Sequence, residues 1–132
     1  METITSEERK ILLKAQQGEM DAVLMYQALA KKASEPRDRQ VFRQLASEEG
    51  KHAAVFYQMT GETLKPKKTK AVLLPLLYTF IRRKGLYPLI AKGEYDAEKS
   101  YAKVVGRFPA IRSVKDDERR HGDMVLDLLN RH

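Results

Sequence analysis

Side chains that bind metal ions recur in the same order in both halves of the chain. A nine-residue pattern, G-E-x-D-A-x-x-x-Y, begins at Gly18 and again at Gly93, 75 residues later. Each copy is followed by one E-x-x-H, at residues 49–52 and 118–121. The candidate ligands are Glu19, Glu49, His52, Glu94, Glu118 and His121. The remaining histidine, His132 at the chain end, is expected to bind nothing.

The E-x-x-H spacing suits metal binding on a helix, because side chains three residues apart lie on one face. Four buried carboxylates in one small core would repel one another, and a buried carboxylate must be protonated, paired or bound to a cation. Two divalent cations would cancel their charge. Carboxylate and imidazole ligands suit iron or manganese, whereas zinc would bind without redox chemistry. The pattern therefore predicts a dinuclear metal site.

Heptad spacing of apolar and candidate-ligand residues predicts four long amphipathic helices. We expect them over residues of about 5–33, 36–60, 86–106 and 109–130. The candidate ligands fall on the seams of these helices, so they face the core and not the solvent. Pro36 suits a first helical position, and Gly61 suits a position just past a helix end. No stretch of the sequence is typical of a β-strand.

A long connection, residues 62–85, joins the second and third predicted helices and contains the most apolar run, 71–81. At about 11 residues this run is shorter than the roughly 20 that a membrane span needs. We expect a crossover segment that packs on the bundle or forms a dimer surface. The alternative is an interfacial membrane contact through residues 71–84, because the run is followed by basic side chains. One long crossover between helix pairs, containing an extra apolar or helical segment, predicts an antiparallel four-helix bundle.

The bulk composition indicates one domain, residues 1–132, without disulfides. The absence of cysteine excludes thiolate metal sites, iron–sulfur clusters and cysteine nucleophiles. The net charge is +7, and basic residues are spread along the chain among nearly as many acids, with denser clusters at residues 65–70 and 82–84 that no nucleic-acid motif accompanies. We therefore expect no nucleic-acid partner. The N-terminus lacks the basic start and apolar run of a signal peptide, so a cytoplasmic location is expected.

The six ligands in this order resemble the ferritin-like superfamily and, within it, most closely the rubrerythrin family. The matching stretches are Gln17-Gly18-Glu19 with Tyr26, Ala46-Ser47-Glu48-Glu49-Gly50-Lys51-His52, Lys92-Gly93-Glu94 with Tyr101, and Asp117-Glu118-Arg119-Arg120-His121. The resemblance spans about residues 15–130. It implies an all-α, ferritin-like bundle, usually dimeric, with two non-haem iron ions that reduce hydrogen peroxide to water. Manganese is the alternative metal.

Two departures from the typical rubrerythrin stand out. Rubrerythrins usually carry a four-cysteine rubredoxin domain, and this sequence has no cysteine, so we expect an external electron donor such as rubredoxin or a reductase. They also carry an extra glutamate three residues after the third-helix ligand. Here that position is Ala97, and Glu98 lies on a different helix face. A symmetric six-ligand site is therefore expected.

Five further side chains are candidates for contacts around the ligands. Glu48 is expected at the surface or beside the ligands. Asp21 and Asp96 match in the repeat and could each hold a histidine of a neighbouring helix, with an ordinary ion pair as the alternative. Tyr26 and Tyr101 lie two turns after the repeat glutamates on the same face. They could donate to ligand carboxylates, with plain packing as the alternative.

The leading functional hypothesis is a di-iron oxidoreductase of peroxidase or ferroxidase type that acts in oxidative stress. The expected roles are terminal ligand for Glu19 and Glu94, bridge for Glu49 and Glu118, and one nitrogen per metal for His52 and His121. One alternative is an iron-handling protein. Another is a membrane-associated hydroxylase resembling demethoxyubiquinone hydroxylase, which the apolar run 71–81 favours.

Overall fold

The computed structural model describes residues 3–130, and all of the regular elements among them are helical. The helices are α1 (Ser6–Lys32), α2 (Pro36–Thr60), α3 (Thr69–Ala102), α4 (Ile111–Asp127) and a final 3-10 turn, η1 (Leu128–Asn130). The expected all-α fold is confirmed. His132 lies outside the described residues.

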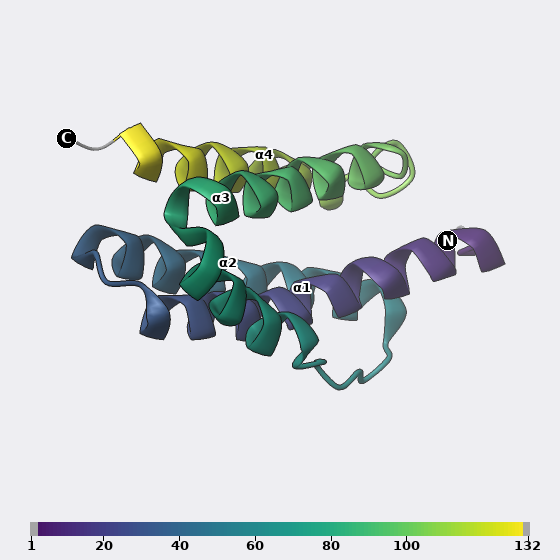
Figure 1. The fold of residues 1–132 in the computed structure, drawn as a ribbon. Helices are drawn as coiled ribbons and strands as arrows, with labels where there is room; N and C mark the ends of the chain where they lie inside the picture. The colour runs from purple at the N-terminus through teal and green to yellow at the C-terminus, as the bar shows by residue number, and fades with distance from the viewer. Residues whose placement is uncertain (1–2, 131–132) are drawn as a thin grey trace.

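The four helices form two antiparallel pairs that pack on each other (Figure 1). Helix α1 pairs with α2, and the second part of α3 pairs with α4. The first part of α3 runs obliquely across the α1–α2 pair and connects the two pairs. This arrangement is the expected ferritin-like antiparallel bundle with one long crossover.

Local sequence signals determine several of the helix ends. The Thr5 hydroxyl accepts a hydrogen bond from the Glu8 amide, and the Glu8 carboxylate accepts one from the Thr5 amide, which closes a capping box. Pro36 occupies the first position of α2, where its missing amide hydrogen is not needed. Gly61 ends α2 in the left-handed conformation with φ of 66°.

The extra helical segment expected in the crossover is present, and it joins the third predicted helix to form α3. The expected helix began at residue 86, whereas the structure is helical from Thr69, with one break at Arg82, where φ is 60° and ψ is −174°. The crossover is therefore mostly a helical segment, residues 69–81. Pro75 lies inside this segment and removes only one backbone hydrogen bond. A side chain at Gly85 would lie 2.8 Å from the Ile81 Cβ, so the sharp turn requires glycine.

A buried polar network anchors this break to the rest of the bundle. The Asp38 side chain on α2 is 1% exposed and accepts two hydrogen bonds from the Arg83 guanidinium, at 2.7 and 3.2 Å. It also accepts one from the Tyr87 hydroxyl at 2.5 Å. The same guanidinium donates to the Leu128 carbonyl at 2.8 Å. The network thus fixes the direction of α3 relative to α2 and the end of α4.

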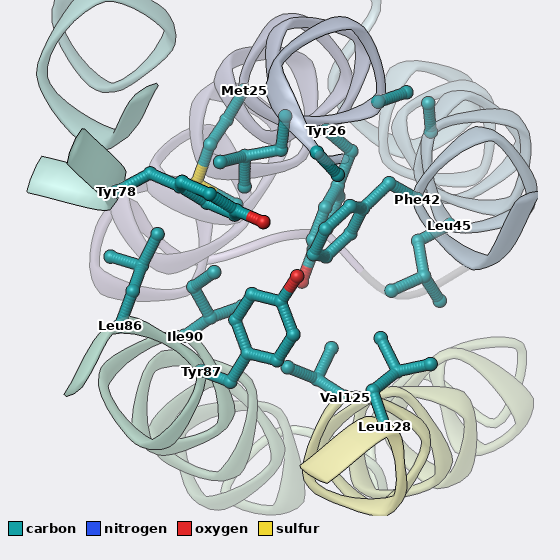
Figure 2. Close-up of a cluster of buried hydrophobic side chains, with 14 residues drawn as sticks. Met25, Tyr26, Phe42, Leu45, Tyr78, Leu86, Tyr87, Ile90, Val125 and Leu128 are labelled. Carbon is teal, nitrogen blue, oxygen red and sulfur yellow. The ribbon is translucent and has the colours of Figure 1, made fainter. Parts of the chain in front are cut away.

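Two apolar clusters occupy opposite ends of the bundle. Figure 2 shows the larger one, in which the Phe42 ring contacts the rings of Tyr26 and Tyr87 between the helices. The other cluster contains Phe56 and Tyr101 at the opposite end. On each helix the candidate ligands fall between the residues of the two clusters. Separately, no helix among residues 3–130 is long and apolar enough to cross a membrane.

We predict that Asp38→Ala lowers the free energy of unfolding by about 3 kcal/mol, because the Arg83 guanidinium and the Tyr87 hydroxyl lose their buried acceptor. Urea unfolding followed by circular dichroism measures the change. The control is Asp127→Ala, which removes an exposed ion pair with Arg37 and should cost less than about 1 kcal/mol. Equal losses in the two variants would contradict the assigned role of the Asp38 network.

Candidate metal centre

The structure brings all six sequence-predicted ligands into one buried layer between the two apolar clusters. Each helix contributes from its middle turns, and none of the six side chains is exposed. The six are Glu19 on α1, Glu49 and His52 on α2, Glu94 on α3, and Glu118 and His121 on α4.

These side chains form two overlapping groups, in each of which one ligand atom per residue lies within 4.8 Å of the others. The first group is Glu19, Glu49, His52 and Glu118, and the second is Glu49, Glu94, Glu118 and His121. Glu49 and Glu118 belong to both groups. Each group could hold a metal ion, and the two shared carboxylates lie where a bridge between two ions would be needed.

The His52 ring turns one nitrogen toward the carboxylates. Its Nδ1 lies 2.9 Å from Glu49 Oε1, 3.1 Å from Glu118 Oε1 and 3.3 Å from Glu19 Oε1. These three oxygens belong to the first group, so Nδ1 faces the place where an ion of that group would lie.

The His121 ring repeats this geometry in the other half of the site. Its Nδ1 lies 3.2 Å from Glu94 Oε2, 3.3 Å from Glu49 Oε1 and 3.4 Å from Glu118 Oε1. The two imidazole rings stack with centroids 5.5 Å apart and an angle of 19° between them. The two halves of the sequence repeat therefore become two facing halves of one cluster.

The outer nitrogen of each histidine is held by an acid from the opposite helix. His52 Nε2 lies 2.8 Å from Asp117 Oδ2, and His121 Nε2 lies 2.8 Å from Glu48 Oε1. A proton held at Nε2 by a carboxylate leaves Nδ1 free to bind a metal. The Arg120 guanidinium contacts both acids and restrains them. Sequence reasoning gave Asp117 no role, although an acid directly precedes the glutamate of both E-x-x-H motifs.

The hypothesis that Asp21 and Asp96 hold the histidines is wrong. Asp21 accepts hydrogen bonds from the Gln17 side chain at 2.8 Å and from the Lys67 amide at 2.7 Å. Asp96 pairs with Lys92 at 2.8 Å. Two residues along a helix correspond to a rotation of about 200°, so both aspartates point away from the cluster that the repeat glutamates face.

The two repeat tyrosines donate to ligand carboxylates across the bundle. The Tyr26 hydroxyl on α1 donates to Glu94 Oε2 at 2.8 Å, and the Tyr101 hydroxyl on α3 donates to Glu19 Oε2 at 2.6 Å. Both tyrosines are buried. The tyrosines therefore orient the carboxylates of Glu19 and Glu94, in addition to packing. By contrast, Glu98 points outside the cluster and pairs with Arg119 at 3.6 Å.

Burial perturbs the protonation of the cluster strongly. Burial and the charge of Glu49 raise the pKa of Glu19 to about 8. Burial and the charges of the neighbouring glutamates raise the pKa of Glu118 to about 12. Burial alone would lower the pKa of His121, but the carboxylates of Glu49 and Glu94 outweigh it and raise the value to about 10. Without metal, the cluster therefore balances its charge by holding protons.

Two atoms of the cluster lack the partners that buried polar atoms need. Among the described residues, Glu118 Oε1 and His121 Nδ1 are buried without a hydrogen bond. Buried polar atoms are nearly always hydrogen-bonded, and leaving one unpaired is costly. Both atoms face the centre of the cluster. A set of four carboxylates and two imidazoles fits divalent cations of the iron and manganese type.

A cavity of about 340 Å³ adjoins the cluster on the side of α1 and α3. The ligand glutamates line its inner end, and small residues from both copies of the repeat line its walls, namely Gly18, Ala22, Gly93 and Ala97. A Cβ atom at Gly18 or Gly93 would meet no other atom within 4 Å. Packing therefore does not require these two glycines, and their effect is to widen the cavity.

A four-helix bundle with one long crossover places the chain in the ferritin-like class. Its layer of four glutamates and two histidines could bind metal. Within that class, the family model described as Rubrerythrin matches residues 10–129, nearly the whole chain. The chain belongs to the rubrerythrin family. No curated protein and no solved structure matches the chain significantly.

We predict that the metal-free protein becomes less stable between pH 5 and pH 9. Glu19, Glu118 and His121 have raised pKa values when folded, so unfolding releases their protons once the pH exceeds the unfolded values. Each such proton lowers the free energy of unfolding by about 1.4 kcal/mol per pH unit. Urea unfolding after dialysis against EDTA measures this, and Glu118→Gln should flatten the dependence. Stability that rises between pH 5 and pH 9 would contradict the prediction.

Proposed function

We propose that the protein is a di-iron oxidoreductase that reduces hydrogen peroxide, with oxygen as the alternative oxidant. The observation that carries the proposal is that the two ligand groups share Glu49 and Glu118. Shared carboxylates suit a dinuclear site with metals about 3.5–4 Å apart. Membership of the rubrerythrin family supports the choice of iron. Homodimer formation, a cytoplasmic location and a role in oxidative stress stay predictions.

In this proposal each half of the cluster would hold one ion, and the side chains would give up the protons that they hold in the metal-free site. Glu19 and His52 would hold one ion, and Glu94 and His121 would hold the other. Two divalent ions carry the four positive charges that four ionised glutamates require. The protons that burial keeps on the cluster leave as the ligands bind.

When bound, two ferrous ions supply the two electrons that, with two protons, convert one hydrogen peroxide into two waters. An external donor such as rubredoxin or a reductase returns the electrons. The Tyr101 hydroxyl occupies Glu19 Oε2 and leaves Oε1 turned toward the cluster. Asp117 and Glu48 keep the histidine protons at Nε2. These contacts hold the ligand atoms in place while the oxidation state changes.

A second candidate function is the oxidation of an organic substrate, and the cavity beside the cluster favours it. Its volume of about 340 Å³ is far larger than peroxide requires, since one water occupies roughly 30 Å³ of liquid. Met25, Leu74 and Ile90 give it apolar walls. A third candidate, iron handling without turnover, uses the same ligands.

We predict about two iron or manganese ions per chain in the purified protein. Glu49→Ala or Glu118→Ala should abolish dinuclear binding, because each removes a carboxylate that both ions need. Elemental analysis and the optical spectrum of the oxidised protein measure the outcome. Glu98→Ala is the matched control, since this glutamate lies outside the cluster. A Glu118→Ala variant that kept two ions would contradict the ligand assignment.

We predict that the reduced protein reacts faster with hydrogen peroxide than with oxygen. Stopped-flow mixing of the anaerobically reduced protein with each oxidant gives the two rates. Comparable or faster reaction with oxygen would instead favour a ferroxidase or a hydroxylase.

We predict that Gly18→Leu and Gly93→Leu slow oxidation by large oxidants more than oxidation by small ones. Neither position is crowded, so the leucine side chain should enter the cavity without disturbing the fold. Replacing a helical glycine should even favour the helix by roughly 0.5–1 kcal/mol. Oxidation by hydrogen peroxide should change less than about threefold, whereas oxidation by cumene hydroperoxide should slow at least about tenfold. Equal slowing of both, with the metal content unchanged, would show that the cavity does not select by size.

A further inference from the structure

Exposed large apolar side chains concentrate on one segment of the chain. Seven such side chains are exposed among residues 3–130, and all but Tyr57 belong to α3. Five lie close together in the crossover part of that helix, namely Val72, Leu73, Leu76, Phe80 and Ile81. Phe80 is 74% exposed and Val72 is 68% exposed. Apolar patches of this kind on a protein surface usually mark a binding surface.

The crossover part of α3 is apolar on both of its faces. Tyr78 is buried in the larger apolar cluster, and Leu74 and Leu77 pack against that cluster. Leu73, Leu76 and Phe80 follow at steps of three and four residues, so they share the opposite face. The bundle covers the inner face and leaves this outer face open. Together with Val72 and Ile81, these three residues form the outer apolar face.

The chain around the outer apolar face carries positive charge without acidic side chains. Residues 63–93 contain no Asp or Glu and eight basic residues, which are Lys65, Lys67, Lys68, Lys70, Arg82, Arg83, Lys84 and Lys92. Elsewhere acidic and basic side chains nearly balance, so this stretch accounts for the net charge of +7. Six of the eight are exposed at the two ends of the 69–81 segment. Among residues 3–130, only Arg83 and Lys92 of the eight form ion pairs, with Asp38 on α2 and Asp96 on α3.

We infer that the outer apolar face binds the surface of an anionic lipid bilayer. The apolar side chains would enter the boundary between headgroups and acyl chains, and the flanking lysines and arginines would meet the phosphates. The segment 69–81 has 13 residues, fewer than the roughly 20 that a span needs, so it lies along the surface. A second copy of the chain is a poorer occupant, because it would bring two cationic stretches together.

Binding in this orientation places the cavity of the metal centre at the lipid boundary. Lys70 and Leu74 of the crossover segment and Leu89 of the second part of α3 line that cavity, and Lys70 and Leu89 are also exposed. The cavity therefore reaches the surface beside the outer apolar face. A lipid-soluble molecule could enter it without crossing water. This consequence for the substrate rests on the proposed function, whereas lipid binding itself does not.

Vesicle flotation of the full chain tests the inference. Wild-type protein should float with vesicles of phosphatidylcholine and phosphatidylglycerol and stay in solution with phosphatidylcholine alone. The Leu76→Glu, Phe80→Glu double variant should lose at least about tenfold in binding, since charges enter the acyl boundary poorly. Tyr57→Glu is the matched control, because this exposed ring lies on α2, and its binding should not change. Circular dichroism confirms that each variant is folded.

Two charge-reversal variants test whether the lysines beside the outer apolar face contact the lipid, or whether only the net charge of the protein attracts it to anionic vesicles. Lys67→Glu with Lys68→Glu should weaken flotation at least about tenfold. Lys10→Glu with Lys51→Glu makes the same change in net charge on α1 and α2 and should weaken it less than about threefold. Wild-type protein that never floats, or controls that lose as much as the test variants, would overturn the inference. So would a dimer that Phe80→Glu converts to monomers without any vesicle binding.

Metal content measured on the same samples keeps the two proposals apart. Protein that floats without binding metal would contradict the proposed function but not the lipid contact. Protein that binds two ions per chain but does not float would contradict the lipid contact but not the proposed function.

Discussion

The burial of four carboxylates and two imidazoles in one layer is the constraint on which the rest of the structure depends. Ionised groups are poorly tolerated in an apolar core unless opposite charges or protons balance them. The six side chains meet only if the four helices keep their register, since a shift of one turn displaces a residue by about 5.4 Å. Apolar clusters on both sides of the layer fix that register. The packing of the core thereby sets the geometry of the site.

The polar contacts of the site join helices that are not connected by a short loop. Short connections, residues 33–35 and 103–110, join α1 to α2 and α3 to α4. The tyrosine contacts instead join α1 to α3, because Tyr26 and Tyr101 donate across the bundle. The contacts of His52 with Asp117 and of His121 with Glu48 join α2 to α4. Each of these four links ends at a candidate ligand, so the same interactions orient the ligands and join the two helix pairs.

The features that could be predicted from the sequence are those that depend on periodicity within one helix. The ligands lie three or four residues from other core positions, and caps such as Pro36 and Gly61 act on their own helix. The contacts of Asp117 depend on the rotation of one helix against another, which spacing along one helix does not give. The junction between the crossover segment and the third predicted helix was missed for a similar reason. The break at Arg82 is held by the remote Asp38, through Arg83 and Tyr87.

The cluster is nearly symmetric, but its surroundings are not. On the side of α2 and α4, Glu48, Asp117 and Arg120 form a charged network over the outer nitrogens of the histidines. On the side of α1 and α3, small residues leave a cavity that reaches the ligand glutamates. The crossover segment, residues 69–81, contributes to the wall of that cavity. The repeat therefore accounts for how metal ions could be held, whereas the non-repeated crossover shapes the cavity beside them.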